Sequence, residues 1–240
     1  MAAPQAVPRA RSDLTLRAVL FDVDFTLAKP GPEFGPEGYV RAAMRCGLTI
    51  DPSKHADARA AALADLQKHP ELEHDEEIWV AFTERMLQGM GAEGERVREC
   101  AVAIEQAWAR AEHFEIYEDV LPVLDELRSQ GIGIGLVTNG ARDLDEFIDH
   151  HGLRERVDVA VSSRAHGRVK PHESIFRAAL AELGVEAEEA AMVGDSPEDD
   201  IEGARALGMR ALLLDREGRF PDERNRLPDL YALPAVLGMR

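Results

Sequence analysis

The chain has 240 residues, of which 45% are hydrophobic, and this composition is ordinary for a globular protein with a sizeable core. Its 28 basic and 45 acidic residues give a formal charge of −17, which disfavours nucleic acid and anionic membranes as partners. The sequence has no apolar run of membrane-spanning length and no signal-peptide core, and Cys46 and Cys100 lack metal-ligand spacing, so we expect a cytoplasmic protein with reduced thiols.

The elements expected along the chain alternate between strands and helices. After a flexible leader at 1–16, residues 18–21 form a short apolar run that is typical of a strand buried on both faces. Similar runs follow at 132–137, 157–161, 190–193 and 211–214, with amphipathic helical patterns between them. This alternation predicts an α/β fold with a Rossmann-like parallel sheet, in which ligands bind beyond the carboxyl ends of the strands.

Residues 28–114 differ from the rest because they contain no strand-like run and their pattern is helical throughout. Ile78, Trp79, Phe82 and Met86, for example, share one helical face. We interpret 28–114 as an inserted α-helical domain, with the core formed by 17–27 and 115–240. The alternative, one continuous α/β domain, would require an unusually long first crossover.

Polar residues follow the predicted strands at the edge where a ligand should bind. Asp22 and Asp24 follow the first strand, Thr138, Asn139 and Gly140 end the second, Lys170 lies in the loop after the third, and Asp195 and Asp200 follow the fourth. Several carboxylates brought together repel one another unless positive charge lies between them, and Lys170 alone supplies too little. We therefore expect a hard divalent cation, most naturally Mg²⁺, beside a phosphoryl group held by Thr138, Lys170 and the amides of Asn139 and Gly140.

Each of these motifs alone also fits a purely structural role. The Thr138–Asn139–Gly140 segment could be a tight turn. Ser196 suits a helix N-cap and Asp199 suits the matching capping box, so Asp199 is not assigned to the metal. Lys170 is the only lysine after Lys68 in a chain that otherwise uses arginine, which favours a specific need for a compact charge.

Four motifs together resemble those of the haloacid dehalogenase-like hydrolase superfamily: DVDFTL, VTNG, the lysine of VKP, and GDSPEDD. The helical insert is similar to the cap of its helical-cap (C1) phosphatase subgroup. The resemblance implies that Asp22 attacks phosphorus and becomes an aspartyl phosphate, while Asp24 acts as general acid and then base. It also implies that Thr138 and Lys170 hold the phosphoryl oxygens. The side chains of Asp22 and Asp195 and the backbone carbonyl of Asp24 would bind Mg²⁺, and Asp200 would support the metal from outside its ligand shell.

The resulting prediction is a Mg²⁺-dependent phosphatase for a small phosphomonoester, present as a monomer or homodimer. Asp24 argues against a dehalogenase, which needs no acid for its halide, and Thr26 stands where mutases of the superfamily tend to have valine. Phe25 replaces a glycine of many relatives, which implies an ordinary backbone there, or strain. A phosphomutase, a 2-haloacid dehalogenase and a non-catalytic module that binds a phosphometabolite remain alternatives. Lys29, Tyr39, Arg41 and Arg142 are candidates for substrate specificity by position only.

Overall fold

A six-stranded parallel sheet organises the core in this computed structural model, which describes residues 16–140 and 142–239. The strand order is β5-β4-β1-β6-β7-β8. The strands are β1 (Ala18–Phe21), β4 (Gly133–Thr138), β5 (Val159–Ser162), β6 (Ala190–Gly194), β7 (Arg210–Leu214) and β8 (Arg226–Leu227). The predicted α/β fold is confirmed, although β8 is too short to leave a sequence pattern. The predicted leader falls almost entirely on 1–15, outside the described residues.

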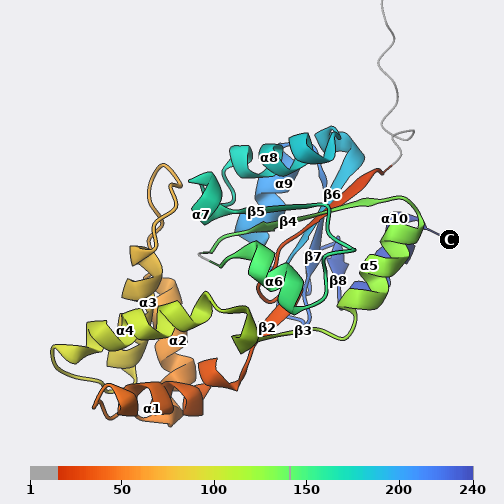
Figure 1. Ribbon diagram of the computed structural model, residues 1–240. Coiled ribbons are helices and arrows are strands. Elements are labelled where there is room, and N and C mark those ends of the chain that lie inside the picture. The colour runs from red at the N-terminus through yellow and green to blue at the C-terminus, as the bar shows by residue number, and fades with distance from the viewer. Residues whose placement is uncertain (1–15, 141, 240) are drawn as a thin grey trace, which may run out of the picture.

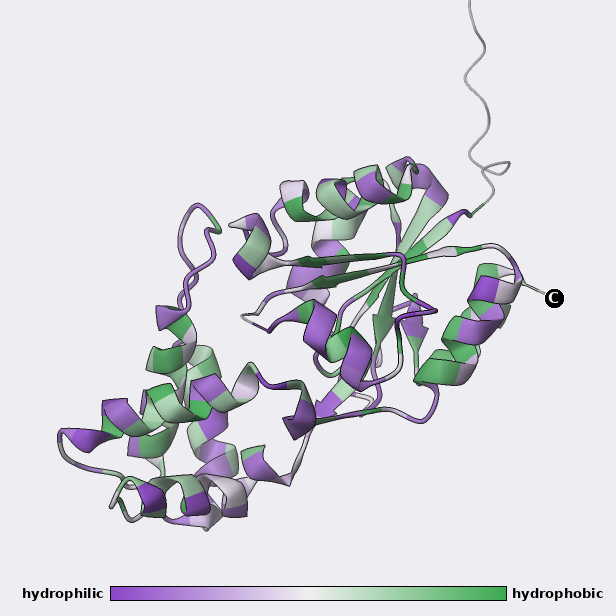
Figure 2. Ribbon diagram, viewed as in Figure 1, coloured by the Kyte–Doolittle hydropathy of each residue, from purple (hydrophilic) through white to green (hydrophobic). Residues whose placement is uncertain are grey.

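The central strands are apolar because both of their faces are covered. On β1, Val19 and Phe21 belong to one hydrophobic cluster, whereas Ala18 and Leu20 belong to the other. Gly135 of β4 allows a close approach, since a Cβ there would lie 2.6 Å from the Leu20 side chain. Figure 2 shows hydrophobic residues along the strands and hydrophilic ones on the outer sides of the helices.

Helices cover the two faces of the sheet (Figure 1). One cluster includes residues of α5 (Val120–Ser129), α6 (Leu144–His150) and α10 (Leu233–Leu237), and the other includes residues of α8 (Glu173–Leu183) and α9 (Gly203–Ala206). A short helix, α7 (Ser163–His166), follows β5. Shorter helical turns are η1 (Pro32–Phe34), η2 (Pro52–Lys54), η3 (Ala111–His113), η4 (Ala187–Glu189), the π-type turn η5 (Pro197–Glu202) and η6 (Leu230–Ala232). Across 16–140 and 142–239, no helix has the length and hydropathy that crossing a membrane requires.

The predicted helical insertion is confirmed: α1 (Pro36–Arg45), α2 (His55–Ala64), α3 (Glu77–Gly89) and α4 (Arg96–Trp108) leave the sheet as a separate group in Figure 1. They enter and return through two short antiparallel strands, β2 (Ala28–Pro30) and β3 (Phe114–Ile116). The expectation that 28–114 contains no strand was therefore wrong. Three-residue strands give no readable alternation, and their pairing is a tertiary contact between distant segments.

The helical insert also contacts the core through the segment between α2 and α3, which Figure 1 shows beside α7. The Val169 amide donates to the Leu72 carbonyl at 2.8 Å, and the His74 amide donates to the Gly167 carbonyl at 3.0 Å. Since the strand pair and this segment are far apart along the chain, the insert is attached to the core at two separate places.

Candidate active site

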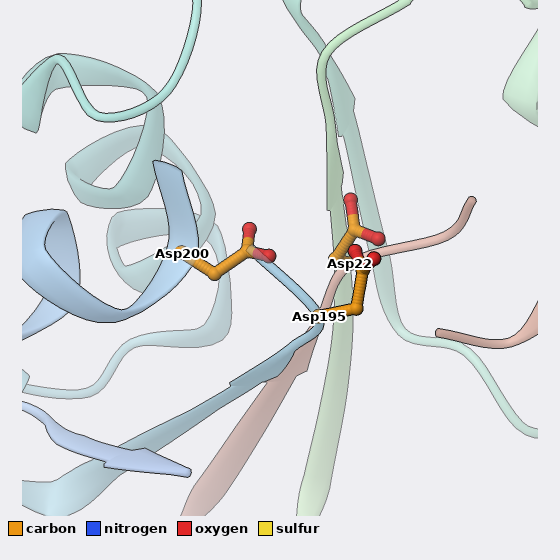
Figure 3. A group of neighbouring side chains, drawn as sticks. All are labelled: Asp22, Asp195 and Asp200. Atoms are coloured by element: carbon orange, nitrogen blue, oxygen red, sulfur yellow. The ribbon is translucent and has the colours of Figure 1, made fainter. Parts of the chain in front are cut away.

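Three aspartates from two neighbouring strand ends lie together. The Asp22 amide continues the β1–β6 pairing by donating to the Val193 carbonyl at 2.9 Å, and Asp195 directly follows β6. Asp200 reaches the same place from η5. Its approach requires Gly194, because a Cβ there would lie 2.1 Å from Asp200 Oδ2. Figure 3 shows the three carboxylates directed toward a common space, and their nearest oxygens lie within 4.8 Å of one another.

Lys170 provides the positive charge within this cluster. Its Nζ donates to Asp22 Oδ1 at 2.6 Å, to Asp200 Oδ1 at 2.7 Å and to the Val137 carbonyl at 2.8 Å. The lysine is only 1% exposed, and buried charges are tolerated when they are paired in this way. The use of a lysine here is thus explained by three acceptors arranged around one compact ammonium.

The cluster nevertheless has too little positive charge. Burial raises the pKa of Asp22 well above its usual range, Lys170 opposes this rise, and Asp200 and Asp195 add to it. Burial, followed by the charge of Asp200, raises the pKa of Asp195 to about 7. Burial would lower the pKa of Lys170, but Asp200 and Asp22 outweigh it and raise the pKa. One buried ammonium therefore stays charged among three carboxylates, which leaves a surplus of negative charge within the described residues of the cluster.

These residues fit a divalent cation. Asp22 Oδ2 is buried and has no hydrogen-bond partner among the described residues, so one oxygen of this carboxylate is free while the other is held by Lys170. Carboxylate oxygens are ligands that Mg²⁺ prefers, and this metal commonly uses only one or two protein carboxylates with water and phosphate. Arg219, whose Nη2 lies 3.5 Å from Asp195 Oδ2, is half exposed and adds only a weak charge at the edge.

Asn139 fixes the position of Lys170. The Lys170 amide donates to Asn139 Oδ1 at 2.6 Å, and Asn139 Nδ2 donates to the Lys170 carbonyl at 3.0 Å. Thr138, the last residue of β4, is 2% exposed beside them. The Asn139 side chain is thus used for orienting the lysine, which leaves its backbone as the part available for the predicted phosphate contact.

The Gly140 amide is engaged within the protein. It donates to Ser163 Oγ at 3.0 Å, and that hydroxyl lies 2.9 Å from Nδ1 of His74 in the helical insert. The predicted contact between the Gly140 amide and phosphate therefore remains a prediction that requires this bond to open or to be shared.

The Asp24 side chain is not a member of the three-aspartate cluster, although its charge acts on Asp195, and it is 28% exposed. Arg142 Nη2 is 2.9 Å from Asp24 Oδ1. The next residue, Phe25, has φ 63°, so the expectation of an ordinary backbone was wrong and the alternative, strain, is observed. The Phe25 amide donates to the Ala28 carbonyl at 2.6 Å, and this tight turn between β1 and β2 forces the left-handed conformation.

The turn that carries Asp200 differs from the predicted capping box. Ser196 Oγ accepts from the Asp199 amide at 3.1 Å, as expected of an N-cap, but the Ser196 amide donates to Asp200 Oδ2 at 3.0 Å. Asp199 as the partner in the box was therefore wrong. The π-type turn, in which the Ile201 amide donates to the Ser196 carbonyl, adds a residue and brings position 200 back toward the cap. Asp199 binds Lys68 of the insert instead.

The other positional candidates for specificity have local partners. Lys29 Nζ lies 3.3 Å from Glu115 Oε2, the buried Tyr39 hydroxyl contacts Met86 Sδ at 3.5 Å, and Arg41 donates to the Pro32 carbonyl at 3.4 Å. Within the described part of the chain, Arg142 is the one candidate of the four that pairs with a predicted site residue.

Sequence reasoning missed several residues around the site. Arg216 binds both oxygens of Asp119 at 2.7 and 2.9 Å and donates to the Thr26 carbonyl at 3.0 Å, so it supports the turn after β1. Arg216 and Ser163 each follow shortly after a predicted strand, and the rule that directed attention to strand ends could have found them. Lys68 carries no such signal, because it lies between two helices of the insert.

Comparison with known proteins places the chain in a family. A model of the haloacid dehalogenase-like hydrolase family matches residues 16–208. A phosphoserine phosphatase of Thermus thermophilus is 38% identical over 62% of this chain, which spans 60% of that relative. A glyceraldehyde 3-phosphate phosphatase of Methanopyrus kandleri is 32% identical over 89% of this chain and 90% of its own length. The crystal structure of a HAD phosphatase from Thermococcus onnurineus aligns with a TM-score of 0.65 and 27% identity, over 93% of this chain and 98% of that one. The resemblance seen in the motifs is thereby confirmed, and the chain belongs to the haloacid dehalogenase-like hydrolase family.

Proposed function

We propose that the protein is a Mg²⁺-dependent phosphatase that hydrolyses a small phosphomonoester through an aspartyl-phosphate intermediate on Asp22. The observation that carries this proposal is the state of the Asp22 carboxylate. Lys170 holds one of its oxygens at 2.6 Å, and the other is buried without a partner among the described residues, beside Asp195 and Asp200. A carboxylate that is fixed and incompletely satisfied in this way suits a nucleophile.

The metal site would be built from the side chains of Asp22 and Asp195 and the backbone carbonyl of Asp24, with Asp200 supporting it from outside the ligand shell. When bound, Mg²⁺ would neutralise phosphoryl oxygens and the surplus carboxylate charge. The orientation of Asp200 toward Lys170 and the Ser196 amide supports its indirect role, since both of its oxygens already have protein partners.

The proposed reaction has two displacements at phosphorus. A carboxylate oxygen of Asp22 forms a bond to phosphorus while the bond from phosphorus to the ester oxygen breaks, and Asp24 gives that oxygen its proton. Water then attacks the phosphorus of the aspartyl phosphate, Asp24 takes up the proton of the water, and inorganic phosphate leaves with the Asp22 carboxylate restored. Thr138 and Lys170 would hold the phosphoryl oxygens throughout, with help from the amides of Asn139 and Gly140.

The relatives and the helical insert support the proposed substrate class. Two relatives are named as phosphatases of phosphoserine and of glyceraldehyde 3-phosphate, both of which are small phosphomonoesters. We infer that 28–114 is a C1-type cap on a core formed by 17–27 and 115–240, because helices α1–α4 lie between β1 and β4 along the chain. A cytoplasmic location, a monomeric or homodimeric state, and the absence of nucleic acid or membrane partners stay predictions.

The test is hydrolysis of millimolar p-nitrophenyl phosphate with Mg²⁺ and with EDTA, followed by a panel of phosphorylated metabolites. Activity should require Mg²⁺ and vanish in Asp22→Asn. The matched control is Asp145→Asn, which makes the same change at an aspartate of the exposed ion pair with Arg154 and should retain activity. Activity of Asp22→Asn equal to that of the unsubstituted protein would refute the nucleophile.

The alternatives have separate readouts. Halide release from a 2-haloacid would indicate a dehalogenase, transfer of phosphate to a second sugar hydroxyl would indicate a mutase, and tight binding without turnover over the whole panel would indicate a binding module. The proposal predicts none of these three results.

A further inference from the structure

Arg142 is a buried arginine placed between the candidate acid and the return strand of the insert. It is 5% exposed. Its guanidinium lies 3.8 Å from the centre of the Phe114 ring and 5.2 Å from that of Phe147. One nitrogen, Nη2, lies 2.9 Å from Asp24 Oδ1 and donates to the Trp108 carbonyl at 3.4 Å. The side chain thus contacts aromatic rings, a backbone carbonyl and one carboxylate.

Asp24 is the counter-charge of this guanidinium. Among the ion pairs formed by residues 16–140 and 142–239, Arg142 pairs with Asp24 alone. Its Nε and Nη1 are buried without a hydrogen-bond partner in that part of the chain. A guanidinium removed from water is costly unless charge or a ring face compensates it. Asp24 and Phe114 together supply that compensation, which ties the position of the carboxylate to the position of the arginine.

The contact between Arg142 and Asp24 is electrostatic more than directional. Although the two atoms are 2.9 Å apart, Asp24 Oδ1 has no aligned hydrogen bond within the described residues. An ion pair without alignment keeps the carboxylate near the arginine and still allows it to turn.

The location of Arg142 also connects the acid to the insert. Trp108 ends α4 and Phe114 begins β3, so both lie on the return path from the helices to the core. Asp24 forms a bridge with Ala28, the first residue of β2 on the outgoing path. Arg142 therefore contacts Phe114 of β3 and also Asp24, the residue that bridges to the start of β2.

We propose that Arg142 is a positioning residue: it holds the Asp24 carboxylate beside the return strand of the insert, in place for proton transfer to the leaving oxygen. The inference rests on the proposed function, because it assigns Asp24 its acid role. Arg142 does not bind substrate in this account, since its guanidinium is covered by Phe114 and nearly closed to solvent.

The test compares leaving groups in Arg142→Met, which keeps an apolar chain against Phe114 and removes the charge. The comparison uses kcat/KM, which reports the step that expels the leaving group and not the later attack by water. For an alkyl phosphate, whose leaving oxygen needs a proton, kcat/KM should fall by ~10- to 100-fold. For p-nitrophenyl phosphate, which leaves without one, kcat/KM should fall less than ~3-fold. The matched control is Arg154→Met, an exposed arginine paired with Asp145 and Asp149, and it should leave both rates unchanged.

A double-mutant cycle separates positioning from a structural role. In an Asp24→Asn background, Arg142→Met should cause no further loss on the alkyl phosphate, since the carboxylate that Arg142 holds in place is already gone. Rates are divided by the folded fraction from thermal unfolding. If Arg142→Met does not fold, the test uses Arg142→Lys, which keeps the charge without the planar guanidinium. Its loss of activity should be smaller than the loss predicted for Arg142→Met and should again be larger for the alkyl phosphate than for p-nitrophenyl phosphate.

Three results would overturn the inference. The first is an equal loss on the two substrates, and the second is a fully additive loss in the cycle. The third is unchanged activity on the alkyl phosphate in Arg142→Met or, if that protein does not fold, in Arg142→Lys. If Asp24→Asn itself shows no dependence on leaving group, the acid role in the proposed function fails and the inference fails with it. If Asp24→Asn shows that dependence and Arg142→Met does not, only the inference fails.

Discussion

Lys170→Met tests the electrostatic description of the site most simply. The substitution keeps an unbranched side chain but removes the ammonium that lies 2.6 Å from Asp22 and 2.7 Å from Asp200. At an effective dielectric constant of about 20, each contact has a Coulomb energy of roughly 6 kcal/mol. The desolvation of the buried charges offsets much of this, so removing one partner of such a cluster costs about 3–5 kcal/mol.

For a chain of this length, that loss corresponds to a fall in Tm of about 6–20 °C, since 1 kcal/mol shifts Tm by about 2–4 °C. The assay is thermal unfolding in EDTA at neutral pH, with urea unfolding to obtain the free energy. The control is Lys29→Met, the same change at a half-exposed lysine 3.3 Å from Glu115, which should cost less than about 1 kcal/mol. A Lys170→Met protein no less stable than Lys29→Met would refute this description of the cluster.

Three further predictions concern the metal, pH and the second contact of the insert. Mg²⁺ at about a hundredfold excess over its Kd should stabilise the protein by about 2.7 kcal/mol, which is measured as a rise in Tm. Asp195→Asn should show only a small part of this rise. An undiminished rise in Tm would exclude Asp195 as a metal ligand. Burial, followed by the charges of His150 and Arg142, lowers the pKa of His151 from 6.5 to about 4. Between these two pH values His151 is protonated in the unfolded chain but neutral in the folded one. The free energy of unfolding therefore falls as the pH falls. His151→Leu should flatten that decline in Tm, and an unchanged slope would contradict the assignment. Lys68→Met removes the ion pair with Asp199 and should lower the free energy of local opening at this contact by about 1 kcal/mol. Hydrogen exchange of the His74 amide should then be about fivefold faster, whereas the same change at the exposed Lys54 should leave its rate unchanged.

The residues at strand ends were predictable because their position depends on short local patterns. The sequences of β1 and β6 are apolar because these strands are buried on both faces, and a parallel sheet brings their carboxyl ends to one edge. The structure accordingly brings Asp22, Asp195 and Lys170 together. Asp200 was also found, although by a turn geometry that the sequence did not indicate.

The errors arose where a contact between distant segments, or one extra residue in a turn, decided the outcome. The pairing of β2 with β3 joins residues on either side of the insert, and no local pattern encodes it. The π-type turn makes Asp200, and not Asp199, the acceptor of the Ser196 amide, and Asp199 pairs with Lys68. The left-handed backbone of Phe25 is imposed by the closure of its turn against Ala28, against the preference of its own side chain.

Arg142 shows the same limit for function. Its place after the Thr138–Gly140 segment made it one of four positional candidates. Its contacts with Asp24 and with Phe114, which lies at the far end of the insert, join segments that are distant in the sequence. Local sequence can identify the groups that carry chemistry, because their types and spacing are distinctive. The groups that orient them are chosen by packing, and only the folded chain brings those together.

The central claim is that Asp22 becomes covalently phosphorylated during turnover, and the most direct measurement is chemical trapping. The protein would be mixed with p-nitrophenyl phosphate and Mg²⁺, quenched, reduced with borohydride, and digested for mass spectrometry. The account predicts homoserine at position 22, formed by reduction of the acyl phosphate, and none when substrate is omitted or when EDTA replaces Mg²⁺. Reduction at another carboxylate, or hydrolysis under these conditions with position 22 always unmodified, would contradict it.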